Sequence, residues 1–418
     1  MSGSIRILLG QEVIEIAGFD PQLTVLEWLR TRQRRTGTKE GCAEGDCGAC
    51  TVVLGEIHQG VLRYRSYNAC ILLLATLDGK QLLTVEDLGR DGLHPVQQAL
   101  VDCHGSQCGF CTPGFVMSLF AMYHQEKREQ PPGRAEIDRY LAGNLCRCTG
   151  YAPIIRAARV VLAEPAADSF TTCREQVEHA LAEIQPSPGA EIGFEGRRFF
   201  APRSAAELGR LLADHPEAVM VAGATDVGLW MTKQLRQIPT LIYIGNVAEL
   251  QQLDHLEEDS VLEIGAGVNY SDALDGLVSL YPELAPMLHR LGAIQVRNAG
   301  TIGGNIATGS PIGDMPPALI ALDAKLVLRS LQGRREIDLE QFFIEYGKQD
   351  LRPGEFVEKI RLPLPVPGQQ FRTYKLSKRW DQDISAVCAA FSLVLEDGRV
   401  KAIRLCYGGM AGTPARAI

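Results

Sequence analysis

Eight of the twelve cysteines in this chain fall into two groups within its first 150 residues. The first group has the spacing Cys42-x4-Cys47-x2-Cys50 and is followed by Cys70. The second group joins Cys108-x2-Cys111 to Cys146-x-Cys148. Four cysteines per group match the ligand number of a [2Fe–2S] cluster, and the first spacing is that of the plant-type cluster. Two such sites in series predict a path for electrons rather than a structural clip.

Glycines alternate with the cysteines of the first group, at Gly41, Gly45 and Gly48. A loop that wraps a cluster must turn its backbone N–H groups inward, and glycine permits this because it has no Cβ. Structural zinc, the alternative, more often uses two close Cys-x2-Cys pairs, which disfavours it here. The spacing of the second group, taken alone, is also compatible with zinc. The cysteines without partner spacing are read as small buried hydrophobes: Cys103, Cys173, Cys388 and Cys406.

Composition excludes several classes of function. A net charge of −8 leaves no general surplus of basic side chains for the phosphates of a nucleic acid. No stretch has the length of a membrane span, and the segment Met1-Ser2-Gly3-Ser4 lacks the parts of a signal peptide. We therefore expect a cytoplasmic protein that binds neither nucleic acid nor membrane. In that compartment paired cysteines serve metal or redox chemistry rather than disulfides.

The pattern of apolar residues predicts a multidomain α+β protein. Residues 1–86 combine short strands near 5–8, 13–16 and 51–54 with a helix over 23–32, which indicates a β-grasp, ferredoxin-like domain. In residues 87–163 three prolines each precede an apolar periodic run, as at the first turn of a helix: Pro95, Pro113 and Pro153. A bundle of four helices is predicted there, with Cys146 and Cys148 at the end of one helix.

The remaining chain is predicted to hold a linker and two further parts. Residues 164–190 mix Ala, Pro, Ser and Glu and indicate a linker with one helical turn in its middle. Residues 191–366 form an α/β domain with strands near 219–222, 241–244 and 262–266. A C-terminal α/β subdomain takes residues 367–418, with strands over 386–395 and 400–407.

Two glycine-containing segments of the α/β part have the character of phosphate sites. The first, residues 219–228, runs from a strand through a Gly-x-Thr turn into a predicted helix, where N–H groups and a hydroxyl can reach a phosphate. A tight turn without a ligand explains this segment about as well. The second, residues 300–314, is a loop rich in polar donors that ends on Asp314, which we expect to be free to accept from ribose hydroxyls. Neither segment is a GxGxxG fingerprint, so a Rossmann site is not supported.

Three motifs in the first 163 residues carry a resemblance to a known family. GCAEGDCGAC, GSQCGFCTPG and NLCRCTGY resemble the iron–sulfur part of the xanthine dehydrogenase/aldehyde oxidase family of molybdenum hydroxylases, with all eight expected ligands present. The resemblance implies one plant-type [2Fe–2S] cluster on Cys42, Cys47, Cys50 and Cys70. It implies a second [2Fe–2S] cluster, in the helical domain, on Cys108, Cys111, Cys146 and Cys148. It also implies that Gln107 and Cys148 contact the molybdopterin cofactor of the catalytic part.

The chain after residue 190 resembles the FAD domain of the same family, whose fold is of the vanillyl-alcohol-oxidase type. The resemblance places the pyrophosphate on Val221, Ala222, Gly223, Ala224, Thr225 and Asp226, and on Thr301, Asn305 and Thr308. It places Asp314 on a ribitol or ribose and Lys375 near the flavin; without it, Lys375 reads as an exposed strand lysine. Leu291 stands where the family often has an aromatic residue near the flavin nucleotide. The loop that governs access of NAD would contain Trp380, Asp381, Gln382 and Asp383.

The order iron–sulfur, iron–sulfur, FAD on one chain implies an electron-transferring subunit whose own catalytic group is the FAD. The resemblance implies a large molybdopterin-binding subunit as partner, in a heterotetramer of two small and two large subunits or a larger assembly, and NAD⁺ as acceptor. One alternative is another hydroxylase of the family, acting on an aldehyde, a nicotinate-like heterocycle or carbon monoxide. An alternative of another class is a non-catalytic scaffold that binds zinc and a nucleotide.

Overall fold

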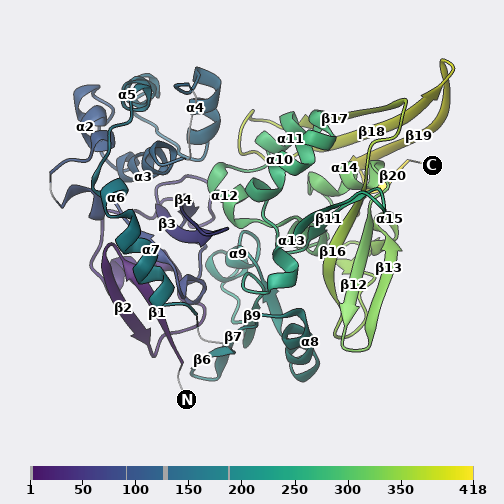
Figure 1. Ribbon diagram of the computed structural model, residues 1–418, viewed down its shortest axis with the longest axis horizontal. Coiled ribbons are helices and arrows are strands. Elements are labelled where there is room, and N and C mark those ends of the chain that lie inside the picture. Colours follow the sequence, from purple (N-terminus) through teal and green to yellow (C-terminus); the bar gives the residue numbers. More distant parts are fainter. Residues whose placement is uncertain (1–2, 91, 126–129, 187–188, 418) are drawn as a thin grey trace. The chain divides into compact units, whose positions relative to one another are not determined.

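The computed structural model describes residues 3–90, 92–125, 130–186 and 189–417 (Figure 1). Met1 and Ser2, on which part of the signal-peptide argument rests, and Ile418, where the chain stops, lie outside the described residues. The contacts within the chain define two compact units. The first unit consists of Met1–Phe200, Ala224–Pro239 and Ala293–Asn298, and the second of Ala201–Gly223, Thr240–Gly292 and Ala299–Ile418. Three pieces of the predicted 191–366 domain, residues 191–200, 224–239 and 293–298, therefore belong to the first unit.

The N-terminal part of the first unit is a five-stranded sheet in the order β2-β1-β5-β3-β4. Strand β1 pairs with β2 in antiparallel and with β5 in parallel register, and β3 pairs with β5 and β4 in antiparallel register. Helix α1 begins after Thr24, whose hydroxyl accepts from the Glu27 N–H, and buries Trp28 and Leu29. These elements are β1 (Ser4–Leu9), β2 (Glu12–Ala17), α1 (Val25–Thr31), β3 (Thr51–His58), β4 (Val61–Asn68), η1 (Leu74–Leu77), β5 (Gln81–Leu83) and η2 (Asp87–Gly89).

Four helices follow, as the sequence predicted: α2 (Pro95–Asp102), α3 (Thr112–Tyr123), α4 (Arg134–Leu141) and α5 (Ala152–Ala163). Proline stands in the first turn of α2, α3 and α5, where its missing N–H is not needed. Helix α3 is apolar on every side and is buried from Gly114 to Tyr123. It is therefore the central helix of this part, and the other three helices pack against it.

The predicted linker is largely helical. Helices α6 (Ser169–Thr172) and α7 (Arg174–Glu183) occupy most of it, and α7 packs against β3 and β4 (Figure 1). Phe170, Val177 and Leu181 are buried in the same core as α3. The prediction of a linker with one helical turn in its middle is therefore wrong: this segment forms helices that pack into the first unit. The reason is that its apolar residues recur at helical spacing.

Shortening Leu181 tests whether these helices are structural. Leu181 is fully buried, so Leu181→Ala should destabilise the folded chain by about 2–5 kcal/mol and lower its thermal midpoint. The control is Gln176→Ala on the exposed side of the same helix, where the effect should stay within about 0.5 kcal/mol. Equal thermal midpoints for the two variants would show that this segment only connects its neighbours and does not stabilise the fold.

The remaining elements of the first unit are short. They are β6 (Ala190–Phe194), most of β7 (Arg197–Ala201), α9 (Val227–Thr232) and most of α12 (Ile294–Ala299).

The second unit contains two main antiparallel sheets. One has the order β10-β11-β16-β12-β13 and the other the order β17-β18-β19-β20. Helix α14 is buried along its whole length and packs on β18 and β19. The strands are β8 (Val219–Val221), β9 (Thr240–Tyr243), β10 (Leu253–Leu256), β11 (Val261–Gly265), β12 (Lys325–Ser330), β13 (Gly333–Asp338), β14 (Phe343–Glu345), β15 (Lys348–Gln349), β16 (Phe356–Pro363), β17 (Gln369–Leu376), β18 (Val387–Glu396), β19 (Arg399–Gly408) and β20 (Ala415–Arg416). The helices are α8 (Ala205–Asp214), η3 (Ala248–Gln251), α10 (Tyr270–Leu280), η4 (Pro282–Leu284), α11 (Ala285–His289), α13 (Ile302–Ala307), α14 (Met315–Ala321) and α15 (Leu339–Phe342).

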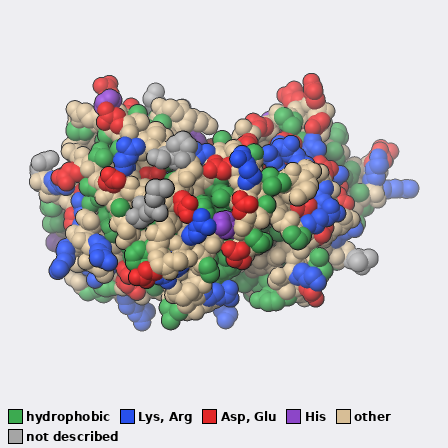
Figure 2. All heavy atoms as spheres, turned by 90° about the horizontal axis from the view of Figure 1, so that it is seen from below, with side chains coloured by type: hydrophobic (Ala, Val, Ile, Leu, Met, Phe, Trp, Pro, Cys, Tyr) green, Lys and Arg blue, Asp and Glu red, His purple; other side chains and the backbone are tan. Residues whose placement is uncertain are grey.

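The surface carries charges of both signs. On the face drawn in Figure 2, acidic and basic side chains are interspersed among apolar and neutral ones. Within the described residues, no helix has both the length and the apolar character that crossing a bilayer requires.

Candidate functional site

The first group of cysteines lies on the loop between α1 and β3, and Cys70 follows β4. Cys50 and Cys70 are buried, whereas Cys42 and Cys47 are half-buried. The Cys42 sulfur accepts from the backbone N–H groups of Asp46, at 3.4 Å, and of Cys47, at 3.3 Å. Gly45 and Gly48 have φ of 77° and 68°, in the left-handed region that glycine adopts without strain. The loop therefore turns its N–H groups toward the sulfurs, as the alternating glycines predicted.

Hydrogen bonds within this group shift the pKa values of its thiols in opposite directions. Hydrogen bonds from Cys47 and then Cys70 hold the pKa of Cys42 well below its ordinary value. The pKa of Cys47 is raised by its hydrogen bond to Cys42, and that of Cys70 by hydrogen bonds to Cys42 and Cys50. Several thiolates cannot coexist here without a compensating positive charge. Iron supplies that charge, so the group fits a [2Fe–2S] cluster.

The second group of cysteines gathers around the start of α3. Cys111 is the N-cap residue of that helix, and Cys108 precedes it. Cys146 and Cys148 lie on the loop between α4 and α5, several residues past Leu141, so the expectation that they end a helix is wrong. The reason is that α4 stops before Gly143, leaving Leu145 outside the helix.

These four sulfurs also converge. Burial, followed by a hydrogen bond to Cys146, raises the pKa of Cys111 to about 12. Burial opposes ionisation of Cys146, but hydrogen bonds, led by that of the Thr149 hydroxyl at 3.2 Å, lower its pKa. The pKa of Cys148 is raised by its hydrogen bond to Cys108. Like the first group, this one needs a cation before all four thiols can ionise, and it fits a second cluster.

One edge of the second group is open to solvent. Cys108 and Cys148 are exposed, and so is Gln107, the other predicted molybdopterin contact. Phe110 is 46% and Tyr151 is 38% exposed beside them. Solvent therefore reaches two of the four sulfurs of this group.

A helix that follows the first predicted phosphate segment reaches the plant-type loop. Helix α9 begins directly after Asp226, as predicted, and ends near Thr232. The Thr232 hydroxyl donates to the Ala43 carbonyl at 2.8 Å, and Lys233 Nζ donates to the Cys42 carbonyl at 2.6 Å. No local sequence pattern predicts these two contacts, because no spacing rule joins residues so far apart.

Residues of the predicted FAD site in the second unit lie on close-packed backbone. A Cβ on Gly223 would lie 1.8 Å from the Ala299 carbonyl oxygen, so only glycine fits there. The segment predicted as a polar loop contains helix α13, which Thr301 caps by accepting from the Gly304 N–H at 3.0 Å. Thr308 is exposed one residue past this helix. Asn305 Oδ1 is buried without a hydrogen-bond partner among the described residues; this oxygen can only accept, so a contact with a pyrophosphate oxygen would have to come from Asn305 Nδ2.

Asp314 and Lys375 form a buried ion pair. Lys375 Nζ lies 2.5 Å from Asp314 Oδ2, and the Ser385 hydroxyl donates to the other carboxylate oxygen. Asp314 is therefore already paired, contrary to the expectation that it is free for ribose hydroxyls. Lys375 is not the exposed strand lysine that the sequence pattern alone suggests, because a buried lysine requires such a partner.

The predicted NAD loop is exposed at Trp380, whereas Asp381, Gln382 and Asp383 are half-buried. Trp380 is 73% exposed, and the Arg290 guanidinium lies 4.2 Å from the centre of its ring. Arg290 also donates to the carbonyls of Trp380 and Lys375. The Arg379 N–H donates to Asp383 and lowers the pKa of that carboxyl. Leu291, by contrast, is buried.

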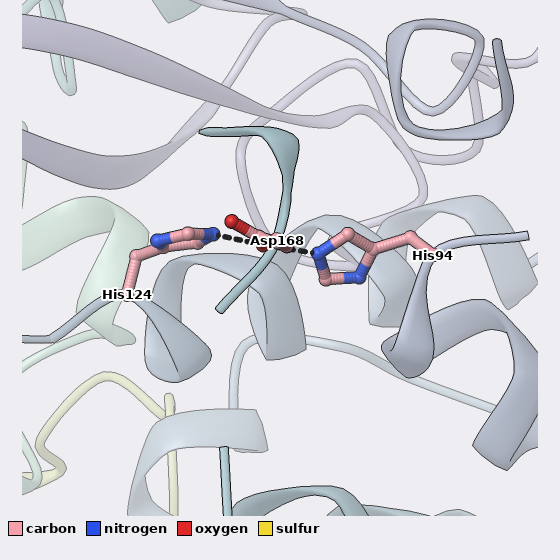
Figure 3. A group of neighbouring side chains, drawn as sticks. All are labelled: His94, His124 and Asp168. Atoms are coloured by element: carbon pink, nitrogen blue, oxygen red, sulfur yellow. Dashed lines mark hydrogen bonds and ion pairs between the residues drawn. The ribbon is translucent and has the colours of Figure 1, made fainter. Parts of the chain in front are cut away.

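A third set of polar side chains has the composition of a metal site: His94, His124 and Asp168 (Figure 3). Asp168 Oδ2 accepts from Nε2 of His94 at 2.7 Å and from Nε2 of His124 at 2.9 Å. His94 Nδ1 accepts from the Val96 N–H at the start of α2, so its proton is on Nε2. A metal bound to Nε2 of His94 would require the ring proton to be on Nδ1, where it would face the Val96 N–H and the hydrogen bond between them would be lost. We therefore interpret these three side chains as a structural contact that joins the capping residues of α2, α3 and α6, and we call it the clasp.

Asp168→Asn tests the clasp. Burial alone would raise the pKa of Asp168, but the hydrogen bonds from His124 and His94 outweigh it and lower the pKa. The stabilisation is thus present above the unfolded value of about 3.9 and is lost only as pH falls through the lower folded value. At pH 7, Asp168→Asn should destabilise the chain by about 1–3 kcal/mol, measured as a fall in thermal midpoint. The exposed Asp102 in α2 provides the control, and an equal shift for Asp102→Asn would refute the clasp.

Family models match most of the chain. Residues 11–74 match the 2Fe-2S iron-sulfur cluster binding domain, and residues 84–159 match the [2Fe-2S] binding domain. Residues 193–365 match the FAD binding domain in molybdopterin dehydrogenase, and residues 372–418 match the CO dehydrogenase flavoprotein C-terminal domain. A solved chain of carbon monoxide dehydrogenase from Hydrogenophaga pseudoflava is 30% identical, with a TM-score of 0.50 over 52% of this chain and 76% of that chain. The chain belongs to the molybdenum hydroxylase family.

Two curated relatives extend this result. Xanthine dehydrogenase of Emericella nidulans is 33% identical over 467 residues, which cover 98% of this chain and 34% of that protein. Xanthine dehydrogenase/oxidase of Rattus norvegicus is 32% identical over 462 residues, with the same two coverages. The chain thus spans about a third of the length of these relatives. It is the iron–sulfur and FAD region of a molybdenum hydroxylase, with two [2Fe–2S] domains and one FAD domain.

Proposed function

We propose that the chain is the small, electron-transferring subunit of an NAD-dependent xanthine dehydrogenase, which converts hypoxanthine and xanthine to urate in the cytoplasm. The observation that carries the proposal is that both cysteine groups and α9, the helix continuing from the FAD-binding segment, share one compact unit. The proposed substrate is supported by the sequence identity to xanthine dehydrogenases, which extends along nearly the whole chain.

A large molybdopterin-binding subunit is the proposed partner, in a heterotetramer of two small and two large subunits or a larger assembly. It would cover the exposed edge formed by Gln107, Cys108 and Cys148. The cysteines at this edge would take up electrons from the partner, and Cys42, Cys47, Cys50 and Cys70 would hold them next. FAD, when bound, converts single electrons into the pair that a hydride to NAD⁺ requires.

For the FAD, we propose that Val221 to Asp226, with Thr301, Asn305 and Thr308, hold the pyrophosphate. The Lys375–Asp314 pair would lie near the flavin and fix its orientation through a polar contact, with Leu291 as an apolar neighbour. The loop from Trp380 to Asp383, which is exposed at Trp380, would control the approach of NAD⁺. Each of these roles rests on matching motifs and on the burial of the side chains described above.

A second candidate is a hydroxylase of the same family that acts on carbon monoxide, an aldehyde or a nicotinate-like heterocycle. This second candidate is supported by the structural similarity to a carbon monoxide dehydrogenase chain. The test is to isolate the chain with its native partner and to assay urate formation from xanthine with NAD⁺. Formation of urate and NADH supports the proposal, whereas turnover of carbon monoxide, an aldehyde or nicotinate without urate supports the second candidate.

Cys111→Ser tests the role of the helical cluster. The serine oxygen is a poor ligand for iron, so electron flow from substrate to NAD⁺ should fall below detection while FAD stays bound. Cys103→Ser is the matched control, because Cys103 is half-buried in the same domain but belongs to neither group. Undiminished substrate-to-NAD⁺ turnover in Cys111→Ser would refute the assignment.

A further inference from the structure

A lysine from a distant part of the sequence reaches the loop of the first cysteine group. Lys233 Nζ donates to the Cys42 carbonyl at 2.6 Å and lies 3.4 Å from the Glu44 carboxylate. Lys233 is the C-cap residue of helix α9, and all three residues belong to the first unit. A positive charge is therefore bonded to the backbone of a residue whose sulfur belongs to the first group.

The backbone and the neighbouring residue fix the place of this lysine. The Lys233 N–H donates to the Leu229 carbonyl within α9, and the Thr232 hydroxyl donates to the Ala43 carbonyl at 2.8 Å. Ala43 has a φ of 54°, in the left-handed region that residues other than glycine adopt at a cost in free energy. The end of α9 thus bonds two successive carbonyls of the loop and holds the strained turn between them.

A charge in this position acts unequally on the two oxidation states of a cluster. Reduction adds one negative charge to a cluster that four thiolates already make negative. A nearby cation stabilises the reduced state more than the oxidised state, and a nearby anion does the opposite. Lys233 and Glu44 are each 42% exposed, so water and salt weaken their effects without abolishing them.

We propose that Lys233 is a positioning residue that raises the reduction potential of the cluster on the first group, and that Glu44 limits this effect. The inference rests on the electron-transfer function proposed above. An electron that reaches the first cluster is then held more firmly, until the flavin takes it up. The residue that sets this potential comes from the segment that continues from the proposed pyrophosphate site, rather than from the cysteine loop itself.

The test is a redox titration of the full chain carrying both clusters and FAD, without partner or substrate. Electron paramagnetic resonance measures the reduced fraction of each cluster at every potential. The signal that is retained in Cys111→Ser identifies the first cluster, and the signal of the second cluster serves as a reference in the same samples. The variants are Lys233→Met, which keeps an apolar stem without the charge, Lys233→Arg, which keeps the charge, and Glu44→Gln.

Two controls separate the charge from other effects of the substitution. Thr232→Val removes the neighbouring hydrogen bond to the loop but no charge, so it reports on the structural role of the end of α9. Arg6→Met removes a positive charge from the exposed face of β1, where the side chain reaches the Gln185 carbonyl, so it reports on the net charge of the chain.

We expect Lys233→Met to lower the ratio of reduced to oxidised first cluster by about three- to tenfold at a fixed potential, where tenfold corresponds to about 59 mV for one electron. Glu44→Gln should raise this ratio, and Lys233→Arg should keep it within about twofold of the parent value. The difference between Lys233→Met and the parent should shrink at high ionic strength, because salt screens a half-exposed charge. The second cluster should titrate as in the parent in every variant.

An unchanged ratio in Lys233→Met would overturn the proposal, as would an equal fall in Thr232→Val or in Arg6→Met. A fall in Glu44→Gln would also contradict it, because the sign would then not follow the charge. Loss of the first cluster in Lys233→Met would overturn it too, since the lysine would then be required for assembly. The proposed reaction can fail independently, because neither substrate nor NAD⁺ enters this titration.

Discussion

The structure depends on holding four cysteine sulfurs close together, twice, in one small unit. Sulfurs so close repel one another as soon as more than one is ionised. Hydrogen bonds among them lower the pKa of Cys42 and raise the pKa values of Cys47 and Cys70, so one thiolate forms at the expense of its neighbours. Backbone N–H groups that point at the Cys42 sulfur stabilise part of the negative charge in the first group. In the second group the start of helix α3, at Cys111, does the same through its dipole. Iron compensates the rest. The glycines, the capped helix starts and the buried core around α3 then serve to hold the two loops where both clusters can assemble.

The same requirement explains why distant pieces of sequence enter the first unit. A loop rich in glycine has little side-chain packing of its own, so other segments must cover it. The chain after Asp226 does so through Thr232 and Lys233, and residues 293–298 do so through Gln295. The clasp of Asp168 on two histidines performs a related task at the other end of the helices, by fixing the start of the segment that was predicted as a linker.

The sequence predicted what local patterns encode. The spacing of the first four cysteines predicted a plant-type cluster, whereas that of the second four left zinc open and only the family resemblance implied a cluster there. Proline before an apolar periodic run predicted α2, α3 and α5. Strand β4 was missed although Leu62, Tyr64 and Ser66 alternate with Arg63 and Arg65, as in a strand buried on one face, and β5 has only three residues. The helices within 164–190 were underestimated, because Ala, Pro, Ser and Glu dominate the composition while a few apolar residues decide the packing. Long-range contacts such as Asp314 with Lys375 and Asn144 with Gln295 have no local signal at all.

Two [2Fe–2S] clusters and one FAD per chain are what all of these features of the fold serve. The most direct test is quantitative analysis of iron, zinc, acid-labile sulfide and flavin in the purified full chain, with electron paramagnetic resonance after reduction. The account predicts about four iron, about four acid-labile sulfide and about one FAD per chain, with two distinguishable cluster signals. About two zinc per chain without acid-labile sulfide would contradict it.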